Sequence, residues 1–145
     1  MKKTLAVALV FAVLVLSGCG AKKEEKLTCT MKTDQSGMVM NQEVEAIFVG
    51  NEVTEMSMDI DVELGETLAP YIETMKETLS TQFQNYSDNG AKVEISAEGN
   101  IVEIDIDMDV KNMTLAQKQS LDMIDVYGTK KATLKAFEQQ GYTCR

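Results

Sequence analysis

The stretch that decides the fold is residues 52–64, which read Glu-Val-Thr-Glu-Met-Ser-Met-Asp-Ile-Asp-Val-Glu-Leu. From Glu55 onward, apolar residues alternate with acidic or hydroxylated ones. Because successive side chains of a strand point to opposite faces, this pattern predicts a strand with one buried and one water-facing side. Residues 102–110, Val-Glu-Ile-Asp-Ile-Asp-Met-Asp-Val, repeat the pattern and predict a second such strand.

Further strands and turns lie on either side of these two stretches. Segments with strand-like composition occur at residues 27–33, 39–49 and 92–97, and a short extended piece at 142–144. Glycine followed by asparagine is a strong hairpin signal. Two such pairs occur, Gly50-Asn51 and Gly99-Asn100, and each joins two predicted strands. The two pairs are 49 residues apart in the sequence.

Helices are predicted where the apolar spacing changes to three or four residues. Residues 67–86 carry one apolar stripe of this kind, with Thr67 as the cap and Pro70 in the first turn. Thr114 opens a capping box for a helix that ends near Ile124. Thr129 opens a last helix, which stops at Gly141.

Together these elements predict an α+β fold, in which helices pack on one face of an antiparallel sheet of five to six strands. The repeated order of hairpin and helix also suggests two ββα-type units. The pattern does not determine the strand order, and so does not determine whether the two acidic strand faces adjoin.

The N-terminal segment predicts a lipoprotein signal peptide. Lys2 and Lys3 precede an apolar run over residues 5–16, and Leu16-Ser17-Gly18-Cys19 matches the lipobox of leucine, two small residues and cysteine. We expect residues 1–18 to be removed and Cys19 to carry a diacylglyceryl group with palmitate-type chains. An uncleaved membrane anchor is the alternative, although the apolar run is shorter than the ~20 residues of a spanning helix.

This signal sets the expected domains and location. Residues 19–26 form the lipidated cysteine and a charged tether, and residues 27–145 form a single α+β lipoprotein domain. Two acyl chains anchor a protein stably. The expected location is the bacterial cell membrane on its extracytoplasmic face, either at the cell surface or on the periplasmic side, with the membrane as a partner through Cys19.

The remaining cysteines form an even pair. Lipidation of Cys19 leaves Cys29 and Cys144, which enclose nearly the whole domain. Exported proteins fold where disulfides persist, so a structural disulfide is expected, worth up to ~4 kcal/mol by restricting the unfolded chain. Free or redox-active thiols are the alternative, but no C-x-x-C motif is present.

The charge of the chain is strongly acidic. After removal of Lys2 and Lys3, 12 basic residues face 23 acidic ones, a net charge of −11. Such a domain repels nucleic acid and anionic lipid, so it is expected to stand off the membrane and to bind no nucleic acid. Metal ions, basic peptides and amine-bearing polymers are compatible partners, although the charge could also serve solubility alone.

The lipobox with its short tether, Leu27-Thr28-Cys29-Thr30 at the domain start and Gly141-Tyr142-Thr143-Cys144 at its end together resemble the YehR-like family of small bacterial lipoproteins. The resemblance covers the whole mature domain. It implies a single small α+β domain on a lipid anchor. It implies no activity, and no functional residue beyond Cys19.

Several kinds of chemistry are excluded by composition. The chain has no histidine, which excludes Ser-His-Asp and Cys-His catalysis as well as histidine-based zinc or copper sites. It has no tryptophan for sugar stacking, no glycine-rich phosphate loop and no G-x-S-x-G motif. No cofactor is expected.

The acidic strand faces are the first candidate site. They carry the carboxylates that a Ca²⁺-like cation would use: Asp59, Asp61, Glu63, Glu103, Asp105, Asp107 and Asp109. Val110 stands where the glycine of a D-x-D-x-D-G loop would be, and a solvated face is the simpler interpretation. Paired carboxylates could also serve a hydrolase, a weaker alternative because any acidic surface offers pairs.

Methionines and aromatic residues supply two further candidates. Met38 with Met40, and Met56 with Met58, resemble thioether ligands of Cu(I), although methionine is also an ordinary core residue. A cavity under the sheet, if present, would be lined by aromatic residues that could equally be core: Tyr71, Phe83, Tyr86 and Phe137.

The sequence therefore favours a non-catalytic, lipid-anchored envelope protein that binds an unknown protein or small ligand. Its first alternative is a cation-binding protein that uses the acidic strand faces.

Overall fold

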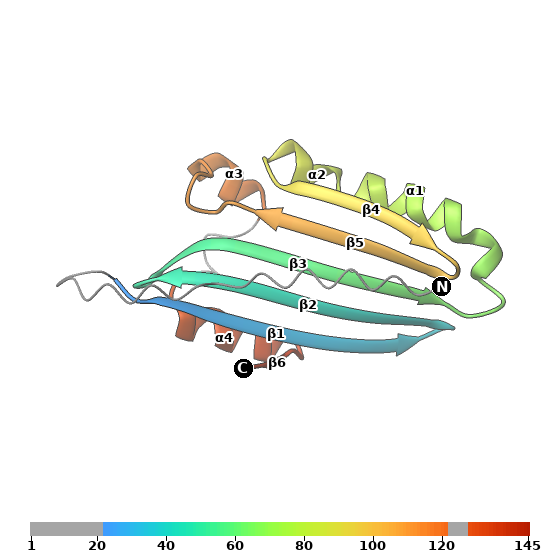
Figure 1. The fold of residues 1–145 in the computed structure, drawn as a ribbon, viewed down its shortest axis with the longest axis horizontal. Coiled ribbons are helices and arrows are strands. Elements are labelled where there is room, and N and C mark those ends of the chain that lie inside the picture. Colours follow the sequence, from blue (N-terminus) through green and yellow to red (C-terminus); the bar gives the residue numbers. More distant parts are fainter. Residues whose placement is uncertain (1–21, 122–127) are drawn as a thin grey trace, which may run out of the picture.

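A computed structural model describes residues 22–121 and 128–145 of the chain. They form a six-stranded antiparallel sheet in the order β4-β5-β3-β2-β1-β6 (Figure 1). The strands are β1 (Glu24–Gln35), β2 (Met38–Val49), β3 (Glu52–Leu64), β4 (Lys92–Glu98), β5 (Ile101–Met108) and β6 (Thr143–Cys144). The predicted α+β class and strand number are confirmed.

The helices pack on one face of this sheet, as the sequence predicts. They are the 3₁₀ turn η1 (Ala69–Tyr71) and the helices α1 (Ile72–Gln82), α2 (Gln84–Asp88), α3 (Leu115–Ser120) and α4 (Lys130–Gln139). Their apolar residues contact the core formed by the inward side chains of the strands. In Figure 1, α4 lies behind β1 and β2, while α1 and α2 lie along β4. Among the described residues, no helix covers the other face of the sheet, which is called here the open face.

The core is built by the alternation that the sequence displays. On β5, Val102, Ile104, Ile106 and Met108 are buried while the residues between them are exposed. Phe48 and the inward residues of β3 pack beside them. Each such side chain stabilises the fold by about 1.5–3 kcal/mol through burial. The strand pattern read from the sequence therefore corresponds to the hydrophobic core.

Both glycine–asparagine pairs form the predicted hairpin turns. Gly50 and Gly99 have φ of 68° and 64°, in the left-handed region that glycine adopts at low cost. Hairpins β2–β3 and β4–β5 therefore both have a glycine at the first central position of the turn. Two hairpins, each followed by a helix, agree with the expected ββα-type units, but β1 adds a third strand to the first of them.

The predicted helix over residues 67–86 is wrong in its start and its continuity. The caps before η1 and α1 are Leu68 and Tyr71, neither of which makes a side-chain cap hydrogen bond, so Thr67 is not the cap. The helix is interrupted at Phe83, where the backbone leaves helical geometry between α1 and α2. Packing against the sheet, rather than capping, positions this segment.

The other two helix starts agree with the sequence. Thr114 accepts a hydrogen bond from the backbone N–H of Gln117, whose side chain accepts one from the backbone N–H of Thr114. This is the predicted capping box. Thr129 caps α4 by accepting from the N–H of Ala132.

The first strand begins earlier than predicted. β1 starts at Glu24, so Glu24, Glu25 and Lys26 of the expected tether belong to the sheet. These three residues face Val49, Phe48 and Ile47 of β2 in the antiparallel register. Pairing with the long strand β2 therefore extends β1 as far as Glu24. Charged residues are tolerated at the start of β1 because they lie at the edge of the sheet.

Some predictions lie outside the described residues. They are the signal peptide over residues 1–18, the lipidated Cys19, the next two residues of the tether, and the end of the helix near Ile124. Within residues 22–121 and 128–145, no helix has the length and apolar character needed to cross a membrane.

The C-terminus is joined to the sheet by a disulfide. Cys29 of β1 and Cys144 of β6 face each other in the strand register, with Cα atoms 4.0 Å apart, and their sulfur atoms are bonded. Thr28 and Arg145 exchange two backbone hydrogen bonds beside it, of 3.1 and 2.9 Å. Tyr142 packs edge-on against Phe137 of α4, with ring centroids 5.1 Å apart. The disulfide thus holds β6, and through it α4, against β1.

We expect removal of this disulfide to destabilise the fold strongly. The bond spans 115 residues, so the chain-entropy model gives a loss of about 2–5 kcal/mol in the free energy of unfolding. Urea unfolding with and without reductant measures this loss. The double variant C29S/C144S serves as the control, because it should be insensitive to reductant; equal unfolding midpoints for oxidised and reduced wild type would contradict the expectation.

Candidate functional site

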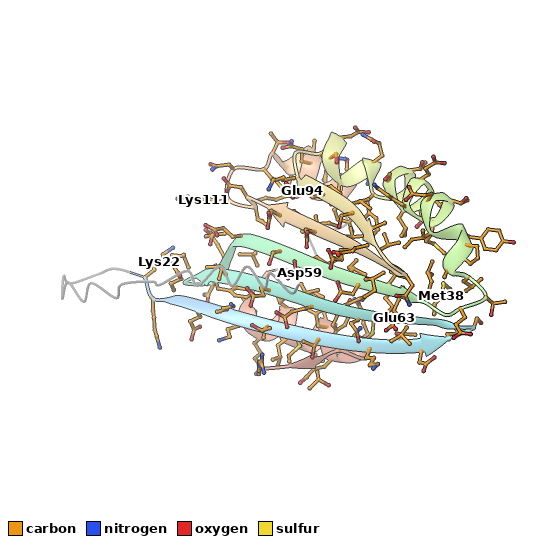
Figure 2. All side chains as sticks on the ribbon, turned by 45° about the vertical axis from the view of Figure 1, so that its right-hand side comes forward. Lys22, Met38, Asp59, Glu63, Glu94 and Lys111 are labelled. Atoms are coloured by element: carbon orange, nitrogen blue, oxygen red, sulfur yellow. A yellow bond between two sulfur atoms is a disulfide. The ribbon has the colours of Figure 1, made fainter. Side chains whose placement is uncertain are left out.

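The open face of the sheet carries the acidic residues that the sequence analysis singled out. Asp59, Asp61 and Glu63 are exposed on β3, and Asp105 and Asp107 on β5. Figure 2 shows Asp59 near the middle of the sheet, Glu94 on the β4 side and Glu63 toward one end. No helix of the described residues packs on this face.

Pairing of β3 with β5 makes the two acidic faces neighbours. Asp59 lies directly opposite Asp105, and Asp61 lies opposite Glu103. Side chains directly opposite each other on antiparallel strands are about 4.5–5.5 Å apart at Cβ, and like charges there are destabilising. The strand order therefore creates a row of repelling carboxylates that neither strand has alone.

The row continues on both sides of this pair. Glu43 of β2 faces Asp59, and Glu94 of β4 faces Asp105. One straight line of four acids thus crosses four strands: Glu43, Asp59, Asp105 and Glu94, called here the acidic row. Glu43 and Glu94 could not be identified from the sequence, because only the register places them beside the other acids.

Two carboxyl groups, one in the acidic row and one beside it, have raised pKa values. Partial burial, followed by repulsion from Asp105 and Glu43, raises the pKa of Asp59 above its ordinary value of 3.8. Partial burial, followed by repulsion from Glu103 and Asp105, raises the pKa of Asp61 in the same way. Both groups thus favour neutralisation by a proton or by a cationic partner.

Lysines neutralise only the margins of the acidic region. Lys26 forms an ion pair with Glu45, which faces Thr28 and Ser57 in the strand register. Lys92 pairs with Glu94 at 2.8 Å, and the hydrogen bond to Glu94 raises the pKa of Lys92. The Lys92–Glu94 pair is exposed and the Lys26–Glu45 pair is partly exposed, and an ion pair near the surface contributes about 0–1 kcal/mol. The centre of the acidic row, Asp59 and Asp105, has no ion pair among the described residues.

The proposed metal ligands are only partly brought together. Glu63 lies opposite the apolar residues Val39 and Ile101 and does not face another acid directly. Asp109 lies beyond the end of β5, where its carboxylate accepts a hydrogen bond of 2.7 Å from the Asn112 side chain. Among the described residues, no three acidic or cysteine side chains converge as a metal site requires. The acids form a flat array in which parallel side chains do not point at a common centre.

Two hollows open to solvent lie at the margins of this face. The larger, of about 1070 Å³, is at the end of the sheet where β1 begins. Its lining combines apolar residues such as Ile47 and Val49 with Lys26, Lys92 and Lys111. The smaller, of about 500 Å³, lies near β6 and includes Glu43 and Asp61.

The aromatic cavity expected from the sequence is not formed by its four residues. Tyr71 is 61% exposed, whereas Phe137 is 4% exposed and packs in the core. Phe83 and Tyr86 contact each other, with ring centroids 5.7 Å apart, and pack against the core. Neither hollow includes any of the four. Phe83, Tyr86 and Phe137 are therefore core residues, and Tyr71 points to solvent.

The methionine pairs are also separated. Met40 lies opposite Val62 of β3, whereas Met58 lies opposite Val44 of β2. Met40 and Met58 are therefore offset by four positions along the strands, a separation of about 13 Å. Met56 instead faces Met108 in the core. The structure thus favours the core interpretation of the methionines.

Comparison with known proteins supports the fold. No protein-family model and no curated protein sequence matches the chain. The NMR structure of E. coli YehR is similar with a TM-score of 0.60 and 15% sequence identity, over 85% of this chain and 91% of that one. The NMR structure of a Streptococcus pneumoniae TIGR4 protein is similar with a TM-score of 0.57 and 11% identity, over 100% and 99%. The chain therefore has a YehR-like fold, and at these identities the likeness extends to the fold alone.

We expect the variant D59N to be more stable than wild type near neutral pH, by a few tenths to about 1 kcal/mol, because it removes repulsion across the acidic row. The sign follows from the raised folded-state pKa of Asp59: the fold binds the proton more tightly than the unfolded chain does. The contribution of Asp59 to the free energy of unfolding is therefore lost as pH rises from about 3.8 through the folded-state pKa. The variant D59N has no carboxyl group at this position and should not show that loss.

Urea unfolding over a pH series measures both effects. The matched control is E63Q, which removes one negative charge where the facing residues are apolar. A stability gain for E63Q as large as that for D59N would assign the effect to net charge rather than to the acidic row.

Proposed function

We propose that this protein is a lipid-anchored, non-catalytic binding module on the extracytoplasmic face of a bacterial membrane. Its binding surface is the open sheet face around the acidic row, and its partner is a basic segment of another envelope protein. The observation that carries the proposal is the register, which aligns Glu43, Asp59, Asp105 and Glu94 in one line that no described helix covers.

The cost of the acidic row supports a binding role. Acids directly opposite each other destabilise a sheet, and a surface that served solubility alone could disperse them at no cost. Partial burial and, after it, repulsion from neighbouring acids raise the pKa of Asp59 and of Asp61, so the negative charge at both positions is unfavourable. Lysine or arginine side chains of a partner would relieve it on binding, so part of the stabilisation would exist only in the complex.

The shape of the surface suits an extended polypeptide. Neighbouring strands lie about 4.8 Å apart and alternate side chains about 6.7 Å apart, so the carboxylates form a regular grid. An extended basic chain has alternate side chains at a comparable spacing. The Ca²⁺ alternative needs six to eight oxygen ligands around one point, which a flat grid does not provide.

The non-catalytic assignment rests on chemistry as well as shape. The chain lacks histidine, and its carboxylates lie on an open face rather than in an enclosed cleft. General acid–base catalysis by carboxyl groups depends on a shielded site that holds the substrate. The lipobox at Leu16–Cys19 supports the location and the anchor.

We expect the full chain to bind a labelled oligolysine peptide with an affinity that falls steeply as salt is added. Fluorescence anisotropy of the peptide measures this binding. The triple variant E43Q/D59N/D105N should lose about ten-fold in affinity, because three of the four charges in the acidic row are removed.

The matched control removes the same charge elsewhere. The variant E63Q/E66Q/E98Q lies at one end of the sheet and should retain nearly wild-type affinity. Equal losses for the two variants would indicate unspecific attraction and contradict the proposed surface. A melting shift with Ca²⁺ in the absence of peptide binding would favour the cation-binding alternative.

A further inference from the structure

We infer that the end of the sheet where β1 begins is a membrane-docking surface that rests on anionic lipid headgroups and holds the domain upright on the bilayer. This inference rests on the proposed lipid anchor at Cys19. It revises the expectation from net charge alone that the domain stands off the membrane.

The length of the tether brings this end close to the bilayer. Glu24 begins β1, five residues after Cys19, and five residues span at most about 17–18 Å. β1 is 12 residues long, so the opposite end of the sheet lies about 40 Å farther away. Of the two ends, therefore, the one at Glu24 is the one that the anchor holds near the headgroups.

Basic residues are concentrated at that end. Lys23 and Lys22 lie against the β2–β3 turn, where the carbonyl of Lys23 accepts a hydrogen bond from Gly50 N–H. Lys130 opens α4 within 3.9 Å of Glu25. Eight of the 12 basic residues after Lys3 are placed there, namely Lys22, Lys23, Lys26, Lys92, Lys111, Lys118, Lys130 and Lys131. Figure 2 shows Lys22 and Lys111 together at this end.

Most of the acidic residues lie elsewhere. The acids of the described residues at the tether end are Glu24, Glu25, Glu45, Glu52, Glu55, Asp88, Asp107 and Asp109, which balance the eight lysines there, and two of them pair with Lys130 and Lys26. The remaining described acids lie along the sheet, on the helices and at the far end, with only Lys32, Lys76, Lys135 and Arg145 among them. The domain is therefore an electric dipole, which an anionic surface orients with the tether end toward it.

Apolar groups at the same end provide a second contribution. Leu115, at the start of α3, is 65% exposed and lies between Lys111 and Lys118 in sequence. Ile47 and Val49 line the 1070 Å³ hollow with Lys26, Lys92 and Lys111. Lysines beside exposed apolar side chains are the composition of surfaces that rest in a membrane interface. In Figure 1, α3 lies at the end where β1 and β4 begin.

Docking of this end has a consequence for the proposed binding surface. The strands would run away from the bilayer, and the open face with the acidic row would be directed sideways. Repulsion between the acidic row and anionic lipid would oppose the alternative in which the domain lies on that face. The row would therefore be accessible to a partner in the envelope.

Tryptophan reporters test the orientation, because the chain contains no tryptophan. The variants L115W and Y71W place a reporter at similarly exposed positions, 65% and 61%, at the two ends of the domain. The lipidated full chain is incorporated into vesicles of phosphatidylglycerol and phosphatidylcholine with brominated acyl chains. We expect quenching and a blue shift for L115W, and neither for Y71W.

Charge variants in the L115W background test the cause. K111E/K118E should lower the docked-to-undocked ratio by at least about five-fold, the factor for about 1 kcal/mol per lysine at an anionic surface. The control K32E/K76E has the same net charge and should leave the quenching unchanged. In vesicles of phosphatidylcholine alone, L115W should also be quenched less than in the vesicles that contain phosphatidylglycerol.

Flotation of the vesicles separates the two proposals. Protein that does not float with vesicles overturns the lipid anchor and with it the docking surface. Protein that floats while L115W is unquenched, or while Y71W is quenched to the same degree, overturns the docking surface and leaves the anchor intact.

Discussion

The antiparallel pairing of β3 with β5 is the interaction on which the rest of the structure depends. It joins the hairpin β2–β3 to the hairpin β4–β5 and so makes one sheet out of two units. On the inner face it places Ile60 beside Ile104 and Met56 beside Met108, all buried. Each buried side chain stabilises the fold by about 1.5–3 kcal/mol, whereas a like-charged pair on the outer face costs about 0.2–1 kcal/mol. Hydrophobic burial therefore outweighs the repulsion between Asp59 and Asp105.

A shift of the register by one or two residues would not relieve this repulsion without a cost. A shift by one residue would turn the apolar side chains of a strand toward water. A shift by two would still set Asp59 against an acid, since Glu103 and Asp107 flank Asp105 on the outer face of β5. The outward residues of β5 from 103 to 107 are all acidic: Glu103, Asp105 and Asp107. Once β5 lies beside β3 in any of these registers, acids of the two strands therefore face each other. Such a row is the physical basis of the proposed binding surface.

The proposed functions use two different distributions of charge. The acidic row lies across the middle of the open face, and the lysines lie mainly at the end where the tether joins the sheet. Net charge alone, −11 after removal of Lys2 and Lys3, describes a uniformly acidic domain and predicts only repulsion from a membrane. Segregation of the charges allows one end to approach anionic lipid while the sheet face binds a cationic partner.

The sequence by itself determined the alternating strands, the hairpins at Gly50 and Gly99, the starts of α3 and α4 and the α+β class, because each follows from local periodicity, turn chemistry or capping. It could not determine the strand order, since β4 and β5 both alternate. Tertiary packing decided it: the inward side chains of β5 are large and fully buried between two neighbours, whereas those of β4 are partly buried at the edge. That order placed Glu43 and Glu94 in the acidic row, a grouping that arises from contacts between residues distant in sequence.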